Sequence, residues 1–200
     1  FSTQINVIKR KFGDRIQPGD IYMLNNPYEG GTHYNDVGVI KPVFVDGALF
    51  AFAISISHWT DIGGKSPGSL PADATEIFQE GICFPGIHIY KADERQDGIF
   101  EMIANNVRIP KMALGDLNAA LASVRIAEKR CLELCAKYGK LAVEETFRHI
   151  LESSERVSRA AVAALPDGVY QAEDWVDGDG ISEERFATHV EVRIEGDAIS

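Results

Sequence analysis

The chain has 200 residues, of which 45% are hydrophobic and 9% aromatic, so it is long and apolar enough to bury a core. Its 20 basic and 30 acidic residues give a formal net charge of -10, which repels nucleic-acid backbones and anionic membrane surfaces. The sequence holds no apolar run of about 18 residues, the length that a membrane-spanning helix needs. We therefore expect a soluble, cytoplasmic protein that binds neither nucleic acid nor membrane.

The cysteines and the chain ends give further information about the kind of protein. Cys83, Cys131 and Cys135 are an odd set without the spacing of a disulfide framework, which argues against a small secreted domain. The sequence opens at Phe1 without an initiator methionine and closes at Ser200 inside a predicted strand. We therefore expect an internal fragment of a longer protein.

Residues 1–110 are predicted to form a β-rich region. A short apolar strand occupies residues 21–24, and strands at 37–45 and 49–58 flank Asp46-Gly47, a dipeptide favoured in two-residue hairpin turns. In the strand at 49–58 bulky residues alternate with Ala and Ser, which predicts one bulky, buried face that ends in a histidine. The sequence thus predicts a hairpin.

A long loop follows the hairpin. Residues 59–86 are rich in Gly and Pro, and long ordered loops in compact domains usually have a function. A short strand is predicted at residues 87–90 and a turn at Asp97-Gly98.

Residues 111–165 have the period of amphipathic helices. Apolar residues recur every three or four positions on both sides of Gly139, which predicts two antiparallel helices joined by a short connection. Alternation then returns in residues 166–200, the predicted start of a further β region. The fold class is therefore α+β, with a β-rich metal-site region (1–110), a helical pair and a terminal β segment.

The candidate chemistry begins in residues 30–36, where two glycines precede His33 and Asp36. In a tight loop this spacing lets both side chains face one point, although a polar loop is the better explanation of so short a motif taken alone. The hairpin adds a third group. A two-residue turn places Asn35 opposite His58, whereas a loop one residue longer places Asp36 there.

Either register brings His33, Asp36 and His58 together at one end of the hairpin, within reach of a shared metal ion. Two imidazoles and one carboxylate leave coordination positions free, as a catalytic site for Zn, Mn or Fe requires. Asp61 repeats the His-to-Asp spacing after His58, and either orients an imidazole or caps the turn at residues 63–64.

Several motifs in order along the chain give it a wider resemblance. The sequence resembles the hydantoinase B / 5-oxoprolinase family and is similar to the large subunits of acetone and acetophenone carboxylases. The motifs that carry the resemblance are residues 19–28, 30–33, 36–37, 58–64, 67–71, 75–81, 106–110, 115–117 and 165–170. In the related carboxylases a His, an Asp three residues later and a second His about 25 residues after the first hold the catalytic metal. His33, Asp36 and His58 match that pattern, whereas Asn26 stands where many members carry Asp.

The resemblance implies a two-part reaction. A partner subunit or domain of the hydantoinase A type, which binds ATP and Mg, phosphorylates a cyclic amide of the hydantoin or 5-oxoproline type, and metal-bound water in this subunit attacks the phosphorylated lactam. A ketone carboxylase with the same site is the alternative. A non-catalytic scaffold subunit is the second alternative. All three interpretations imply a hetero-oligomer.

Three further residues are candidates for catalysis. Arg108 either binds a phosphate group as a bidentate donor or forms a buried structural ion pair. Asp61 is the carboxylate nearest to His58 in sequence. Glu76, like Glu80, is either an acid or base of the reaction or a solvated surface group. The histidines at 88, 149 and 189 match no ligand spacing and are predicted to be structural.

Overall fold

The computed structural model describes residues 2–200, which form two compact units divided between Lys137 and Tyr138. Both units contain helices and antiparallel strands, which confirms the α+β class. The division differs from the predicted boundaries at 110 and 165, because the first long helix packs into the core of the first unit. Within residues 2–200 no helix is both long and apolar enough to cross a membrane.

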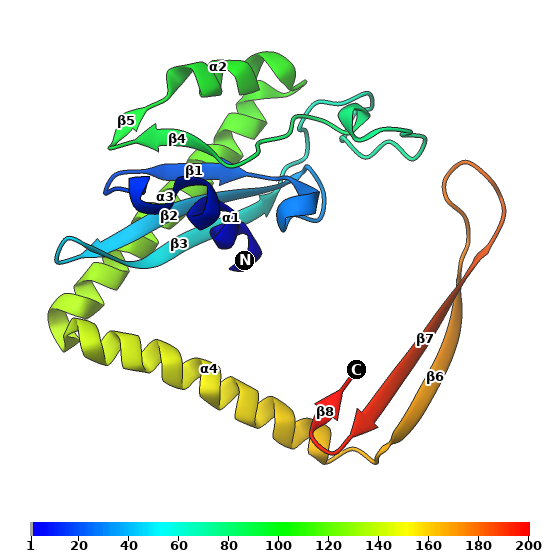
Figure 1. Cartoon of the computed structure of the whole chain (residues 1–200). Coiled ribbons are helices and arrows are strands. Elements are labelled where there is room, and N and C mark those ends of the chain that lie inside the picture. The colour runs from blue at the N-terminus through cyan, green and yellow to red at the C-terminus, as the bar shows by residue number, and fades with distance from the viewer. Residues whose placement is uncertain (1) are drawn as a thin grey trace. The chain divides into compact units, whose positions relative to one another are not determined.

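The first unit is built on a five-stranded antiparallel sheet (Figure 1). The strand order is β3-β2-β1-β4-β5, and every neighbouring pair is antiparallel. The strands predicted from the sequence are confirmed with small shifts at their ends. Their bounds are β1 (Ile21–Leu24), β2 (Asp36–Val45), β3 (Ala48–His58), β4 (Ile87–Lys91) and β5 (Glu94–Arg95).

The β2–β3 hairpin combines features of both predicted registers. It closes through the two-residue turn Asp46-Gly47, whose φ angles of 52° and 77° fit a type I′ turn. The pairing then shifts by one residue between Phe44 and Val43, and this bulge brings Asp36 opposite His58. The turn therefore has the two residues of the first predicted register. At the open end of the hairpin, however, Asp36 faces His58, as in the predicted register with the longer loop.

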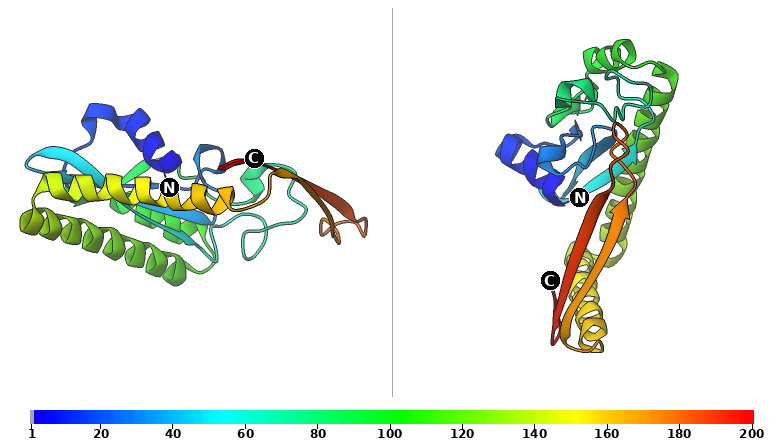
Figure 2. Two further views of the ribbon diagram at one scale, coloured as in Figure 1. Left: turned by 90° about the horizontal axis from the view of Figure 1, so that it is seen from below. Right: turned by 90° about the vertical axis from the view of Figure 1, so that its right-hand side faces the viewer.

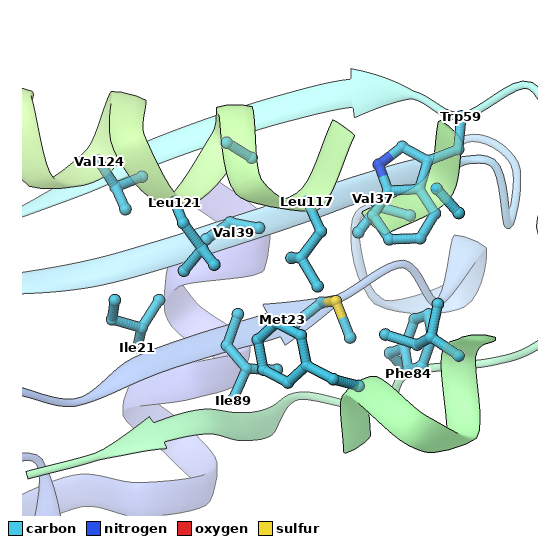
Figure 3. Close-up of a cluster of buried hydrophobic side chains, with 14 of the residues drawn as sticks. Ile21, Met23, Val37, Val39, Trp59, Phe84, Ile89, Leu117, Leu121 and Val124 are labelled. Carbon is cyan, nitrogen blue, oxygen red and sulfur yellow. The ribbon is translucent and has the colours of Figure 1, made fainter. Parts of the chain in front are cut away.

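Side chains at odd positions of β1 and β2 face helix α3 (Pro110–Tyr138). Figure 3 shows Met23, Val37 and Val39 packed against Leu117 and Leu121 of that helix, together with the fully buried Trp59. This apolar face of α3 explains why the helix belongs to the sheet and not to a separate helical region.

Side chains at even positions face helix α1 (Ser2–Phe12), which lies on the side of the sheet opposite α3 (Figure 2). Val7 and Ile8 of α1 pack with Tyr22 and Ile40 in a second, smaller cluster. The sequence pattern predicted a β-rich region for this segment and did not predict the helix.

Two other predictions in this unit are wrong. Asp97-Gly98 begins helix α2 (Asp97–Asn106), because Phe100 and Ile103 give that segment a buried helical face. The bulky face of β3 is only half-buried, whereas Ala53 on the small face is 8% exposed. The small residues let α3 approach the sheet closely, and the bulky side chains of this edge strand lie on the side of the shorter helix.

The second unit contains helix α4 and a separate three-stranded antiparallel sheet, β6-β7-β8. The second predicted helix is confirmed as α4, and the predicted terminal strands are confirmed as β6 to β8, which follow it directly. The right panel of Figure 2 shows β6 and β7 as a long two-stranded ribbon. The bounds are α4 (Lys140–Ala163), β6 (Gly168–Val176), β7 (Phe186–Glu195) and β8 (Ala198–Ile199).

Candidate metal centre

The three candidate ligands lie at the open end of the β2–β3 hairpin. Asp36 is the first residue of β2, His58 is the last of β3, and the two face each other across the ladder. His33 precedes β2 in a tight turn in which the Asp36 N–H donates to the His33 carbonyl at 3.0 Å. Gly30, with a φ of 98°, starts this loop in the left-handed region, where an L side chain would be strained.

The carboxylate of Asp36 joins the two imidazoles. His58 Nδ1 lies 2.8 Å from Asp36 Oδ1, and His33 Nδ1 lies 3.0 Å from Asp36 Oδ2. The two rings are nearly perpendicular, with centroids 5.8 Å apart. One nitrogen from each histidine and one carboxylate oxygen lie within 4.8 Å of one another. The structure thus brings together the three side chains that the sequence singled out.

The electrostatics and exposure of the cluster suit a cation. Burial alone raises the pKa of Asp36, but hydrogen bonds from the His58 ring and from the backbone and ring of His33 outweigh it, so the pKa lies below its ordinary value. The carboxylate is therefore ionised at neutral pH. Both imidazoles are half exposed, which leaves room for further ligands beside the protein donors.

Two buried asparagines fix the loops around the cluster. Asn25 donates to the carbonyls of Tyr34 (2.6 Å) and Ile82 (2.8 Å), so it ties the loop before β2 to the long loop after β3. Asn35 donates to the Trp59 carbonyl at 2.7 Å, next to His58. Sequence reasoning did not select them, although both stand in polar runs beside strands, where a buried amide can bridge two loops.

Asp61 has the capping role among its two predicted alternatives. It is 5% exposed and accepts hydrogen bonds from the backbone N–H groups of Gly63 (3.0 Å), Ile109 (3.0 Å) and Arg108. Its hydrogen bonds within residues 2–200 go to these groups, to the Arg108 guanidinium and to Ser69, and no imidazole is among them. Asp61 therefore anchors the long loop to the start of α3.

Within residues 2–200, the hydrogen bonds and ion pairs of the three candidate ligands do not include Arg108 or Glu76. The Arg108 guanidinium donates to the carbonyls of Gly63 (3.2 Å) and Gly64 (2.7 Å) and lies 3.5 Å from the Asp61 carboxylate, while its side chain is 39% exposed. Glu76 is exposed and precedes the 3-10 turn η3 (Ile77–Gln79). Of the other histidines, His88 lies 3.4 Å from the buried Asp20 carboxylate.

Comparisons with known proteins agree on one family. The family model described as hydantoinase B/oxoprolinase matches residues 1–200. The chain is 34% identical over 197 residues to the B component of the "Putative D-/L-hydantoinase" of Pseudomonas sp. (strain NS671), covering 96% of this chain and 33% of that protein. It is 32% identical over 180 residues to the acetophenone carboxylase delta subunit of Aromatoleum aromaticum, covering 90% and 26%.

The fold has a close counterpart among solved structures. The crystal structure of the ATP-dependent caprolactamase from Pseudomonas jessenii superposes with a TM-score of 0.88 at 29% identity, covering 98% of this chain and 34% of that one. The chain thus spans about a third, or less, of the length of the relatives that it matches. With a family model that matches the whole sequence and relatives in which both sequence and fold agree, the chain belongs to the hydantoinase B/oxoprolinase family.

Proposed function

We propose that this chain is the metal-binding part of an ATP-dependent enzyme that opens cyclic amides of the hydantoin, 5-oxoproline or lactam type. The observation that carries the proposal is the convergence of His33, Asp36 and His58 donor atoms within 4.8 Å at the end of one hairpin. The similarity to a hydantoinase component and to a caprolactamase supports the substrate class.

The donor set fits a divalent cation such as Zn, Mn or Fe. Two imidazole nitrogens and one carboxylate oxygen are a usual combination for these metals, and three protein ligands leave positions for other ligands. A bound cation supplies Lewis acidity, which lowers the pKa of water toward neutrality and polarises an amide oxygen. In this proposal the chain's own residues hold and orient the cation. The hydrogen bonds of Asn25 and Asn35 keep the loops that carry them in place.

The proposal includes a partner. Opening an unstrained amide by this route requires activation of the carbonyl oxygen, and the part of the chain that the structure describes carries no phosphate-binding glycine loop of the Walker type. ATP and Mg are therefore assigned to a hydantoinase A-type subunit or domain. The subunit names of the relatives support this arrangement.

A ketone carboxylase is the second candidate, because the acetophenone carboxylase delta subunit is nearly as similar as the hydantoinase component. The same three ligands serve both reactions. The distinction lies in the substrate, so only turnover separates them. A scaffold without catalysis is the third candidate, and it predicts that the ligand cluster holds no metal.

Two measurements test the proposal on the full-length protein with its partner. Elemental analysis should find about one divalent metal per chain, and its absence would favour the scaffold. ATP hydrolysis coupled to ring opening should occur with hydantoin, 5-oxoproline or caprolactam. Carboxylation of acetone or acetophenone with bicarbonate, without ring opening of any amide, would replace the hydrolase by the carboxylase.

A further inference from the structure

A cavity of about 400 Å³ lies against the loop that carries His33. One wall comes from residues just before that histidine, Pro27, Tyr28 and Thr32, and the other comes from residues 74–80 of the long loop after β3. Its volume is within the usual range for small-molecule sites, which is about 300–1,000 Å³. Thr32 immediately precedes His33, so the first wall and the first candidate metal ligand belong to the same loop.

The chain segments that follow the two walls are joined by hydrogen bonds. The amide of the buried Asn25 donates to the carbonyls of Tyr34 and Ile82, and its oxygen accepts from the Phe84 N–H at 2.6 Å. The Gly31 N–H donates to the Asn26 carbonyl at 3.1 Å, which closes the turn on the first wall. The cavity is therefore formed by loops that hydrogen bonds hold together, as a preformed site requires.

The charge of the lining has one sign. Glu76 and Glu80 line the cavity, and none of its lining residues is basic. Two basic side chains that contact residues next to these segments pair with carboxylates outside the lining: Lys65 with Asp73 at 2.8 Å and Arg10 with Glu29 at 2.5 Å. The remaining lining is a ring, Tyr28, and small or aliphatic groups. The lining thus offers hydrogen-bond acceptors and apolar contact, and its two carboxylates repel anions.

The charge of the lining favours uncharged substrates of the proposed class over those that carry a carboxylate. An uncharged lactam or hydantoin presents a ring N–H, which a carboxylate accepts, and a mostly apolar ring that packs on an aromatic face. The anion of 5-oxoproline carries a carboxylate on the carbon next to that nitrogen, and it would lie close to two like charges. We propose that the cavity beside His33 is the substrate site and that Glu76 and Glu80 make it selective for cyclic amides without a carboxylate. This inference rests on the proposed function.

Binding to the full-length protein in its metal-free form tests the selectivity of the lining without ATP or partner, because a bound cation would itself attract a carboxylate. The probes are 5-oxoproline and 5-oxoprolinamide, which share the ring and differ in charge. Ligand-detected NMR titration should give at least about tenfold tighter binding of the amide, as one repelled charge near two carboxylates predicts. The double variant Glu76→Gln/Glu80→Gln should reduce this preference to about twofold or less, because it keeps the shape and removes both charges.

A charge-matched control separates local from overall charge. Glu144→Gln/Glu152→Gln changes the net charge by the same amount on exposed positions of α4 and should leave the preference unchanged. Equal affinity of the two probes for the unmodified protein, binding of neither, or a preference that survives in the Glu76→Gln/Glu80→Gln variant would each overturn the inference. Ring opening with ATP and partner is scored separately. Selective binding without turnover counts against the proposed function alone, and turnover with charge-blind binding counts against the cavity alone.

Discussion

The chain contains two His-x-x-Asp motifs, and folding uses them differently. In the first, His33 and Asp36 stand on either side of a tight turn, and the carboxylate contacts its own histidine at 3.0 Å. In the second, Asp61 follows His58 past the end of the strand, and its hydrogen bonds go to backbone N–H groups and to Arg108. One motif thus contributes two candidate ligands, and the other contributes one ligand and one loop anchor.

Exposure and partner type explain the difference. Asp36 is 19% exposed at its side chain, and its imidazole partners can be shared with an incoming cation. Asp61 is buried, and three backbone N–H groups donate to its carboxylate. Removal of Asp61 therefore leaves buried donors without partners. Removal of Asp36 leaves two imidazole rings that already contact solvent. The comparison predicts that one substitution affects folding and the other affects ligand binding.

The largest expected effect is on stability. Asp61→Ala should lower the free energy of unfolding by about 3–5 kcal/mol, because it leaves three backbone N–H groups around the buried carboxylate without their acceptor. Urea unfolding monitored by circular dichroism measures the change. Asp36→Ala is the matched control and should cost about 1 kcal/mol or less, given the solvent access of its partners. Equal losses of unfolding free energy in the two variants would contradict the predicted difference between Asp61 and Asp36.

The second effect is on metal affinity. Asp36→Asn should weaken divalent-metal binding by about 100-fold or more, because loss of a direct ligand costs at least as much as loss of a supporting residue. His33→Ala and His58→Ala should act in the same direction. Competition with a chromophoric chelator measures the affinity. His149→Ala, an exposed histidine on α4, should leave it unchanged. An Asp36→Asn protein with unaltered affinity would remove Asp36 from the ligand set.

Part of this contrast could be predicted from the sequence. The Asp46-Gly47 turn and the alternation in β2 and β3 predicted the hairpin, and a hairpin of either register brings His33, Asp36 and His58 to one end. These signals are local, and strand pairing extends them over the whole hairpin. Metal binding by the cluster stays a prediction.

The rest depends on contacts between distant segments. Asp61 and Ile109 are 48 residues apart, and no local pattern distinguishes a capping carboxylate from one that orients a histidine. The bulge near Phe44 has no glycine to mark it, so the pairing of Asp36 with His58 could not be separated from the alternative. Helix α1 has a short apolar face, Ile5, Val7, Ile8 and Phe12, whose burial depends on the sheet beneath it.

A smaller effect on stability is expected from Ser69, which also holds the long loop after β3. The buried Ser69 hydroxyl accepts from the Ile62 N–H at 2.9 Å and donates to the Gly63 carbonyl at 2.7 Å. Ser69→Ala should therefore cost about 1–2 kcal/mol of unfolding free energy, since it leaves a buried donor unpaired. Ser158→Ala, at an exposed position of α4, is the control and should change stability by less than about 0.5 kcal/mol. A neutral Ser69→Ala variant would show that the loop is held by Asp61 alone.

The last effect is the dependence of the Asp61 contribution on pH. Burial raises the pKa of Asp61, but hydrogen bonds from the N–H groups of Gly63, Ile109 and Arg108 outweigh it and hold the pKa below its ordinary value. A carboxyl with a lower pKa in the folded than in the unfolded chain adds stability above its unfolded value, about 3.9, and loses it as the pH falls through the folded value. The stability gap between the unmodified protein and Asp61→Asn should therefore be constant above about pH 5 and shrink in more acidic solution. Because Asp36 is present in both proteins, its own lowered pKa cancels in the difference. A gap that stays constant down to about pH 2 would mean that the Asp61 charge contributes nothing to the anchor.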